Sequence, residues 1–95
     1  QINSSQEPQK SGVEIEKAID IYQEINERYT SLQLKGLMSI SKKSENADEV
    51  RKPFQETYKI FEALEKEGAK ICSMGMSGDF EIAIQEGSNM IRVGR

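Results

Sequence analysis

The sequence contains no histidine, and only one of its 95 residues is a cysteine. Without histidine, the chain can form neither a Ser–His–Asp triad nor a zinc site with imidazole ligands. The lone Cys72 excludes an internal disulfide framework and is typical of a reducing compartment. No apolar run approaches the about 18 to 20 residues of a membrane span, and the polar start does not resemble a signal peptide. We therefore expect a cytoplasmic protein with no membrane partner.

Positive charge is also scarce, because 13 Lys and Arg residues face 16 Asp and Glu residues and give a net charge of -3. This balance, without any basic stripe, argues against nucleic acids and anionic membranes as partners. A hydrophobic content of 36% and a charged content of 31% are typical of a soluble globular protein. A chain of this length forms at most one domain.

The spacing of apolar residues predicts a regular alternation of strands and helices. Apolar residues spaced by three and four positions indicate amphipathic helices, and short apolar runs indicate strands. The expected helices cover residues 15–29, 50–64 and 79–86, and the expected strands cover residues 1–3, 32–40, 69–76 and 88–93.

This alternation predicts an α/β fold in which parallel strands pair through right-handed crossovers. Both an open sheet and a part of a (β/α)8 barrel fit the pattern. The barrel is favoured because the last two strands end in small, polar residues, and barrel phosphate sites commonly follow strands seven and eight.

The stretch at residues 70–80 is an apolar strand that leads directly into a helix start. Ser77, Gly78 and Asp79 combine a hydroxyl group, a residue without Cβ and an acidic residue of the first turn. Backbone N–H groups at such a place can bind a phosphate. We expect Ser77 to face the same void as Gly94, which follows the last strand. The alternative is that Ser77 only caps the helix, which is worth about 1 kcal/mol.

Five short motifs, taken in this order, resemble the pyridoxal phosphate homeostasis proteins, which are built like the N-terminal barrel of alanine racemase. They are Gln-Ile-Asn at residues 1–3, Lys-Ser-Gly at 10–12, Gly-Leu-Met-Ser-Ile at 36–40, Ser-Met-Gly-Met-Ser-Gly-Asp-Phe at 73–80 and Ile-Arg-Val-Gly at 91–94. The resemblance implies that residues 1–95 are one partial domain, the C-terminal part of a (β/α)8 barrel from the end of strand five to strand eight. It also implies a protein that binds pyridoxal phosphate, is not an enzyme and has PLP-dependent apoenzymes as partners.

The resemblance further implies which residues bind the cofactor. Its phosphate group is expected at Ser77, through the hydroxyl and the adjoining N–H groups up to Gly78, and at the backbone of Gly94 and Arg95. Arg92 matches the arginine near the pyridine nitrogen, and Asn3 is expected to support the pocket.

The sequence departs from the family pattern in two places. Arg95 stands where the family usually has Thr or Ser, so a hydroxyl contact is lost. The Schiff-base lysine of the family lies on the first strand, which is not in this sequence. Lys35 lies near the entry end of its strand and is not expected to replace that lysine. For Arg92, the alternative is a structural ion pair with a carboxylate such as Asp79.

Three functions remain open from the residues. The first is a pyridoxal phosphate carrier, the second is an amino-acid racemase and the third is a half-barrel that binds no cofactor alone. A racemase needs a proton donor and acceptor on opposite faces of its substrate, whereas Tyr22, Tyr29 and Tyr58 all fall on expected helices. A complete barrel is expected to be monomeric, and a half-barrel with exposed strand edges is expected to self-associate.

Overall fold

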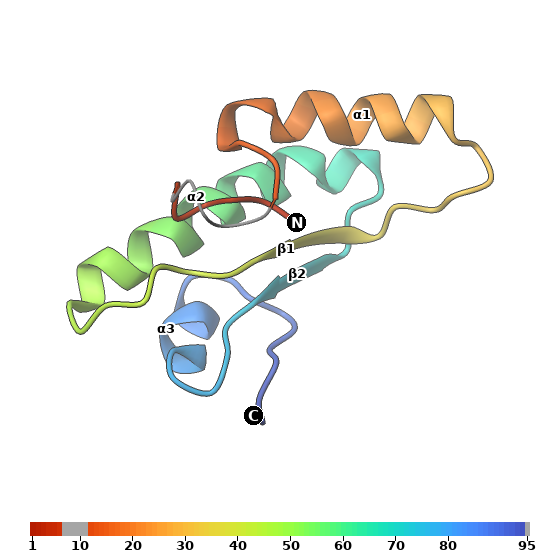
Figure 1. Ribbon diagram of the computed structural model, residues 1–95. Coiled ribbons are helices and arrows are strands. Elements are labelled where there is room, and N and C mark those ends of the chain that lie inside the picture. Colours follow the sequence, from red (N-terminus) through yellow and green to blue (C-terminus); the bar gives the residue numbers. More distant parts are fainter. Residues whose placement is uncertain (7–11, 95) are drawn as a thin grey trace.

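The computed structural model describes residues 1–6 and 12–94 (Figure 1). Residues 10 and 11 of the Lys-Ser-Gly motif, and Arg95, lie outside the described part of the chain. The elements, in chain order, are the 3-10 helix η1 (Ile15–Lys17), helix α1 (Ala18–Arg28), strand β1 (Gly36–Ser39), helix α2 (Ala47–Leu64), the 3-10 helix η2 (Glu65–Glu67), strand β2 (Ile71–Met74) and helix α3 (Phe80–Gln85).

The strands are parallel, as the sequence predicts. β1 pairs with β2, with Gly36 opposite Ile71. Single parallel bridges extend this pair on both sides, because Ile2 bridges to the end of β1 and Met90 bridges to Ser73 of β2. The four parallel segments therefore lie side by side in the order in which they occur along the chain.

The strands are shorter than predicted, and the segment at residues 88–93 forms only a bridge. Three backbone hydrogen bonds still join this segment to β2 and the residue after it, from Asn89 N–H to the Cys72 carbonyl at 3.1 Å, from Met74 N–H to the Met90 carbonyl at 3.0 Å and from Arg92 N–H to the Gly75 carbonyl at 2.9 Å, and side chains add to them. Asn89 accepts a hydrogen bond from the N–H group of Cys72 at 2.8 Å and donates one to the carbonyl oxygen of Lys70 at 2.8 Å. Ser88 donates to the carbonyl oxygen of Met74 at 2.7 Å. Backbone and side-chain hydrogen bonds thus satisfy the edge of β2 together.

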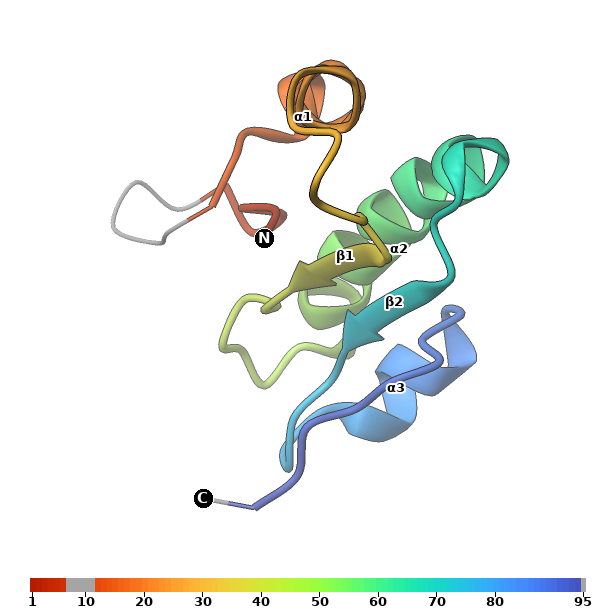
Figure 2. The same ribbon diagram turned by 90° about the vertical axis from the view of Figure 1, so that its right-hand side faces the viewer.

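The helices form one layer on one face of the strands. α2 packs against both β1 and β2, and it contacts α1 on one side and α3 on the other (Figure 2). The core lies between this layer and the sheet, where Phe54, Leu64, Cys72, Met74 and Ala83 are completely buried. No helix of the described residues is long and apolar enough to cross a membrane.

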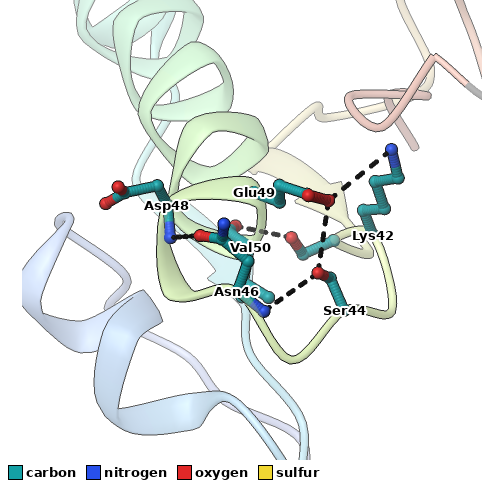
Figure 3. Close-up of polar contacts among 7 residues, drawn as sticks. Lys42, Ser44, Asn46, Asp48, Glu49 and Val50 are labelled. Atoms are coloured by element: carbon teal, nitrogen blue, oxygen red, sulfur yellow. Dashed lines mark hydrogen bonds and ion pairs between the residues drawn. The ribbon is translucent and has the colours of Figure 1, made fainter.

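Helix α2 begins at Ala47, three residues before the predicted start, because polar side chains fix the preceding loop (Figure 3). The Asn46 side chain caps the helix by accepting a hydrogen bond from the N–H group of Asp48 at 2.9 Å. Ser44 accepts from the N–H group of Asn46 at 3.0 Å, and Ser41 donates to the carbonyl oxygen of Val50 at 2.6 Å. These contacts fasten the end of β1 to the first turns of α2.

Candidate functional site

The residues that the sequence singles out gather at one edge of the sheet. In a parallel sheet all carboxyl ends lie on the same side, and ligands of α/β proteins bind there. Asn3 follows the bridge at Ile2, Ser77 and Gly78 follow β2, and Gly94 follows the bridge at Met90.

Ser77 and Gly94 are joined directly although they are 17 residues apart. The Ser77 hydroxyl donates a hydrogen bond to the Gly94 carbonyl oxygen at 2.7 Å, and the Gly94 N–H group donates to Ser77 Oγ at 3.0 Å. The turns after the last two parallel segments therefore lie side by side. Gly94 has a φ of 123°, which favours glycine, and a Cβ there would meet nothing within 4 Å.

The turn between β2 and α3 corrects one alternative. Asp79, not Ser77, occupies the N-cap position of α3. Its carboxylate accepts a hydrogen bond from the N–H group of Met76 at 2.8 Å. The interpretation of Ser77 as a helix cap is therefore wrong, because its hydroxyl is bonded to Gly94 instead.

Two hollows border this turn. The first, of about 250 Å³, is lined by Ser77, Gly78, Asp79, Phe80, Glu81 and Ile82. The second, of about 380 Å³, separates Gly78 from the loop before α2 and is lined there by Lys42 and Lys43. The backbone N–H groups of Ser77 and Gly78 donate to no other described residue and are exposed. They are available to an anion, although Glu45 and Asp79 line the second hollow together with the two lysines and Lys42 pairs with Glu49.

Arg92 reaches across the carboxyl ends of β2 and β1. Its Nη2 atom donates to the carbonyl oxygens of Ser39 at 2.8 Å and Ser73 at 3.4 Å. The Nε atom is buried and has no partner among the described residues. No ion pair joins Arg92 to any carboxylate in the described part of the chain, so the alternative pairing with Asp79 is wrong. A buried donor without a partner suits a ligand with an acceptor atom.

The partners of Arg92 were not found from the sequence. Ser39 and Ser73 bind the guanidinium through backbone carbonyls, which every residue has, so their types carry no signal. The only usable signal is their position at the ends of neighbouring strands.

The remaining predicted residues occupy less informative places. Asn3 is half-buried, and its side-chain oxygen accepts a weak hydrogen bond from Ser5 at 3.4 Å. Lys35 is exposed and precedes β1, and its carbonyl oxygen accepts hydrogen bonds from the N–H groups of Lys70 and Ile71. It therefore lies at the opposite end of the strands. Burial raises the pKa of the Cys72 thiol from 9.0 to about 11, so the thiol is a poor nucleophile. The described residues include no cluster of His, Cys, Asp and Glu that could hold a metal.

Sequence comparison gives this arrangement its context. No family model matches the chain. A protein of Helicobacter pylori (strain 26695) named pyridoxal phosphate homeostasis protein is 45% identical over 94 residues, which are 99% of this chain and 41% of the relative. A protein of the same name from Aquifex aeolicus is 34% identical over 97 residues, which are 99% of this chain and 42% of the relative. The chain is related to part of the pyridoxal phosphate homeostasis proteins. It spans about two fifths of their length, and the resemblance in its motifs is confirmed.

Solved structures agree with this relationship. A protein of unknown function from Bifidobacterium adolescentis superposes with a TM-score of 0.90 and 35% identity, over 98% of this chain and 39% of that chain. PipY of Synechococcus elongatus, with PLP bound, superposes with a TM-score of 0.75 and 26% identity, over 90% of this chain and 42% of that chain. The α/β architecture with parallel strands is therefore shared with part of PipY, whose structure contains PLP.

Proposed function

We propose that residues 1–95 are one partial domain of a (β/α)8 barrel, running from the end of strand five to strand eight, and that they supply the phosphate side of a pyridoxal phosphate site. The observation that carries this proposal is the mutual hydrogen bonding of Ser77 and Gly94 at the carboxyl ends of the last two segments. Barrel phosphate sites are commonly built from the loops after strands seven and eight.

The donors at these turns suit a phosphate group. The Ser77 hydroxyl and the N–H groups of Ser77, Gly78 and Gly94 can each donate to a phosphate oxygen. The Ser77 hydroxyl would exchange its bond to the Gly94 carbonyl oxygen, and the Gly94 N–H group its bond to Ser77 Oγ, for bonds to the ligand. The backbone of Arg95 is proposed as a further contact, and Asn3 as a support of the pocket.

Arg92 is proposed to hold the ring of the cofactor at its pyridine nitrogen. Bound pyridoxal phosphate supplies an electron sink for amino-acid chemistry. A guanidinium stays charged at ordinary pH, so it can donate a hydrogen bond to the nitrogen but does not readily protonate it. This partner leaves a weak electron sink, which favours a binding protein over an enzyme.

The positions of the tyrosines also favour a binding protein over an enzyme. Racemisation needs a second proton-transferring side chain, and Tyr22 and Tyr58 lie within helices while Tyr29 follows the end of α1. We therefore propose a cytoplasmic PLP carrier that is monomeric as a complete barrel and has PLP-dependent apoenzymes as partners. The racemase and the half-barrel without a cofactor are the outcomes that a test must distinguish from it.

The test measures binding and turnover in the protein at its full encoded length. We expect the protein to retain PLP in equilibrium dialysis and to leave L-alanine unchanged in a chiral assay. Borohydride reduction followed by peptide mapping is expected to modify no lysine among residues 1–95. Absence of PLP binding overturns the proposal, conversion of L-alanine to D-alanine supports the racemase, and a modified lysine within these residues shows that the site was transferred wrongly.

A further inference from the structure

Two buried hydroxyl groups meet between β1 and α2. Ser39 and Thr57 are both completely buried, and Thr57 Oγ1 lies 2.9 Å from Ser39 Oγ and 3.0 Å from the carbonyl oxygen of Pro53. A carbonyl can only accept, so the single hydroxyl hydrogen of Thr57 satisfies Pro53 and the hydroxyl of Ser39 supplies the hydrogen of the other contact. Each hydroxyl thereby has a hydrogen-bond partner in the buried layer between β1 and α2.

The same serine also contacts the candidate site through its backbone. The carbonyl oxygen of Ser39 accepts the hydrogen bond from Arg92 Nη2 at 2.8 Å, the shorter of the two that this atom donates. A continuous series of hydrogen bonds thus leads from Pro53 and Thr57 in α2, through Ser39, to the guanidinium of Arg92. Thr57 lies in α2, whereas Arg92 follows the segment that bridges to β2.

The place of Ser39 in the sheet makes this connection important. Ser39 is the last residue of β1, so the regular pairing with β2 ends there, while a bridge to Ile2 holds its other side. The contact between its side chain and Thr57 adds the restraint that fixes Ser39 against α2. A long arginine side chain has many rotamers, and its Nε atom has no partner among the described residues.

We propose that Thr57 is a positioning residue for Arg92, because it fixes Ser39 and thereby the carbonyl oxygen that orients the guanidinium. The role of Arg92 toward a cofactor rests on the proposed function, but the positioning itself is a property of this chain. A purely structural hydroxyl pair would stabilise the contact of β1 with α2 and leave the guanidinium unaffected.

The side-chain N–H signal of Arg92 in ¹H–¹⁵N spectra tests the proposal, with Arg92→Lys used to assign it. In the wild-type protein and in Thr57→Ser we expect a resolved signal that exchanges slowly with water. In Thr57→Val, which keeps the shape and removes the hydroxyl, we expect exchange about tenfold faster. Ser39→Ala removes the same contact from the other side and serves where the valine variant does not fold.

Tyr22→Phe is the matched control, because it removes the hydrogen bond from Tyr22 to the carbonyl oxygen of Leu34, 3.2 Å away, before the opposite end of β1. It should leave the Arg92 signal unchanged. The proposal is overturned if Thr57→Val leaves the signal as in the wild type, or if Tyr22→Phe alters it equally.

PLP binding gives a second readout. We expect Thr57→Val to raise the dissociation constant for PLP about threefold to tenfold and to shift the absorption of the bound cofactor, and Thr57→Ser to restore both. A protein that binds no PLP, but whose Arg92 signal follows Thr57, overturns the proposed function and supports the positioning role. If the protein binds PLP but its Arg92 signal is the same in the wild type and in Thr57→Val, the proposed function is supported and the positioning role is overturned.

Discussion

The substitution Ser77→Ala separates the structural role of this serine from its proposed role as a phosphate ligand. The side chain makes two hydrogen bonds to Gly94, at 2.7 and 3.0 Å, and both residues are exposed. After the substitution water can satisfy the Gly94 N–H and carbonyl groups. We therefore expect the free energy of unfolding to fall by only about 0.5 to 1 kcal/mol.

The expected effect on the cofactor is larger. A hydrogen bond to a charged group is worth about 1.5 to 3 kcal/mol, which corresponds to a dissociation constant for PLP about 10- to 100-fold higher. Equilibrium dialysis measures this constant for PLP and, in parallel, for pyridoxal, which lacks the phosphate group. Only the constant for PLP should change. Ser77→Thr keeps the hydroxyl group and should retain most of the affinity.

A control substitution checks that the effect is local. Ser31 is an exposed serine between α1 and β1, before the opposite end of the strands, so Ser31→Ala should leave both constants unchanged. If Ser77→Ala weakens PLP and pyridoxal by the same factor, Ser77 shapes the pocket without contacting the phosphate, and the assignment of the phosphate site is wrong.

Three further predictions concern stability and reactivity. Arg51 pairs with Glu86, which directly follows α3, and the two side chains are 30% and 18% exposed, so Arg51→Ala should lower the free energy of unfolding in urea by about 1 kcal/mol. Arg28→Ala removes an exposed pair and should cost less than about 0.5 kcal/mol; equal losses would contradict this. Gly87 has a φ of 111°, and an alanine Cβ at this position would lie 2.3 Å from a tyrosine ring. Gly68 has a φ of 99°, and a Cβ there would meet nothing within 4 Å. We expect the free energy of unfolding in urea to fall by about 1 to 2 kcal/mol in Gly68→Ala and by about 1 to 3 kcal/mol more in Gly87→Ala. Similar losses in the two variants would argue against the clash with the tyrosine ring. The ultraviolet absorbance of the thiolate should give Cys72 a pKa of about 11 in the folded protein. The unfolded chain loses the thiol proton at a lower pH than the folded protein does. The contribution of the thiol to the free energy of unfolding should therefore fall between about pH 9 and 11, by up to about 1.4 kcal/mol per pH unit. A midpoint near 9 for the titration of the folded protein would contradict the burial of Cys72.

The helices were predictable because their apolar residues recur with the helical period. In α2, Phe54, Phe61 and Leu64 are buried as the pattern indicates. Its start was predicted too late because the Asn46 cap precedes the first apolar residue and leaves no trace in the hydrophobic pattern. The last strand was predicted too long, because its backbone pairs with β2 through isolated hydrogen bonds and the side chain of Asn89 makes two further contacts to the same edge.

The candidate site was predictable in its place but not in its contacts. Consecutive parallel strands end at the same edge, so the meeting of Ser77 and Gly94 follows from the order of elements. The sequence pattern could not show that Asp79 takes the cap position, because Ser and Asp are both good caps. Nor could it show that Arg92 avoids the carboxylates, because its partners are backbone carbonyl groups.

The reach of Arg92 shows how this stretch of chain can gather one ligand. Arg92 follows Met90, which bridges to β2, yet its Nη2 atom bonds to Ser39 at the end of β1. Neighbouring strands lie about 4.8 Å apart, so the side chain and its hydrogen bond to Ser39 together cross the end of β2 over about two strand spacings. The guanidinium is thereby brought toward the middle of the four parallel segments, while the turns of Ser77 and Gly94 remain on the side of the last two. In the proposed site the phosphate group of the ligand would bind at the two turns, while its ring would extend toward β1 and Asn3.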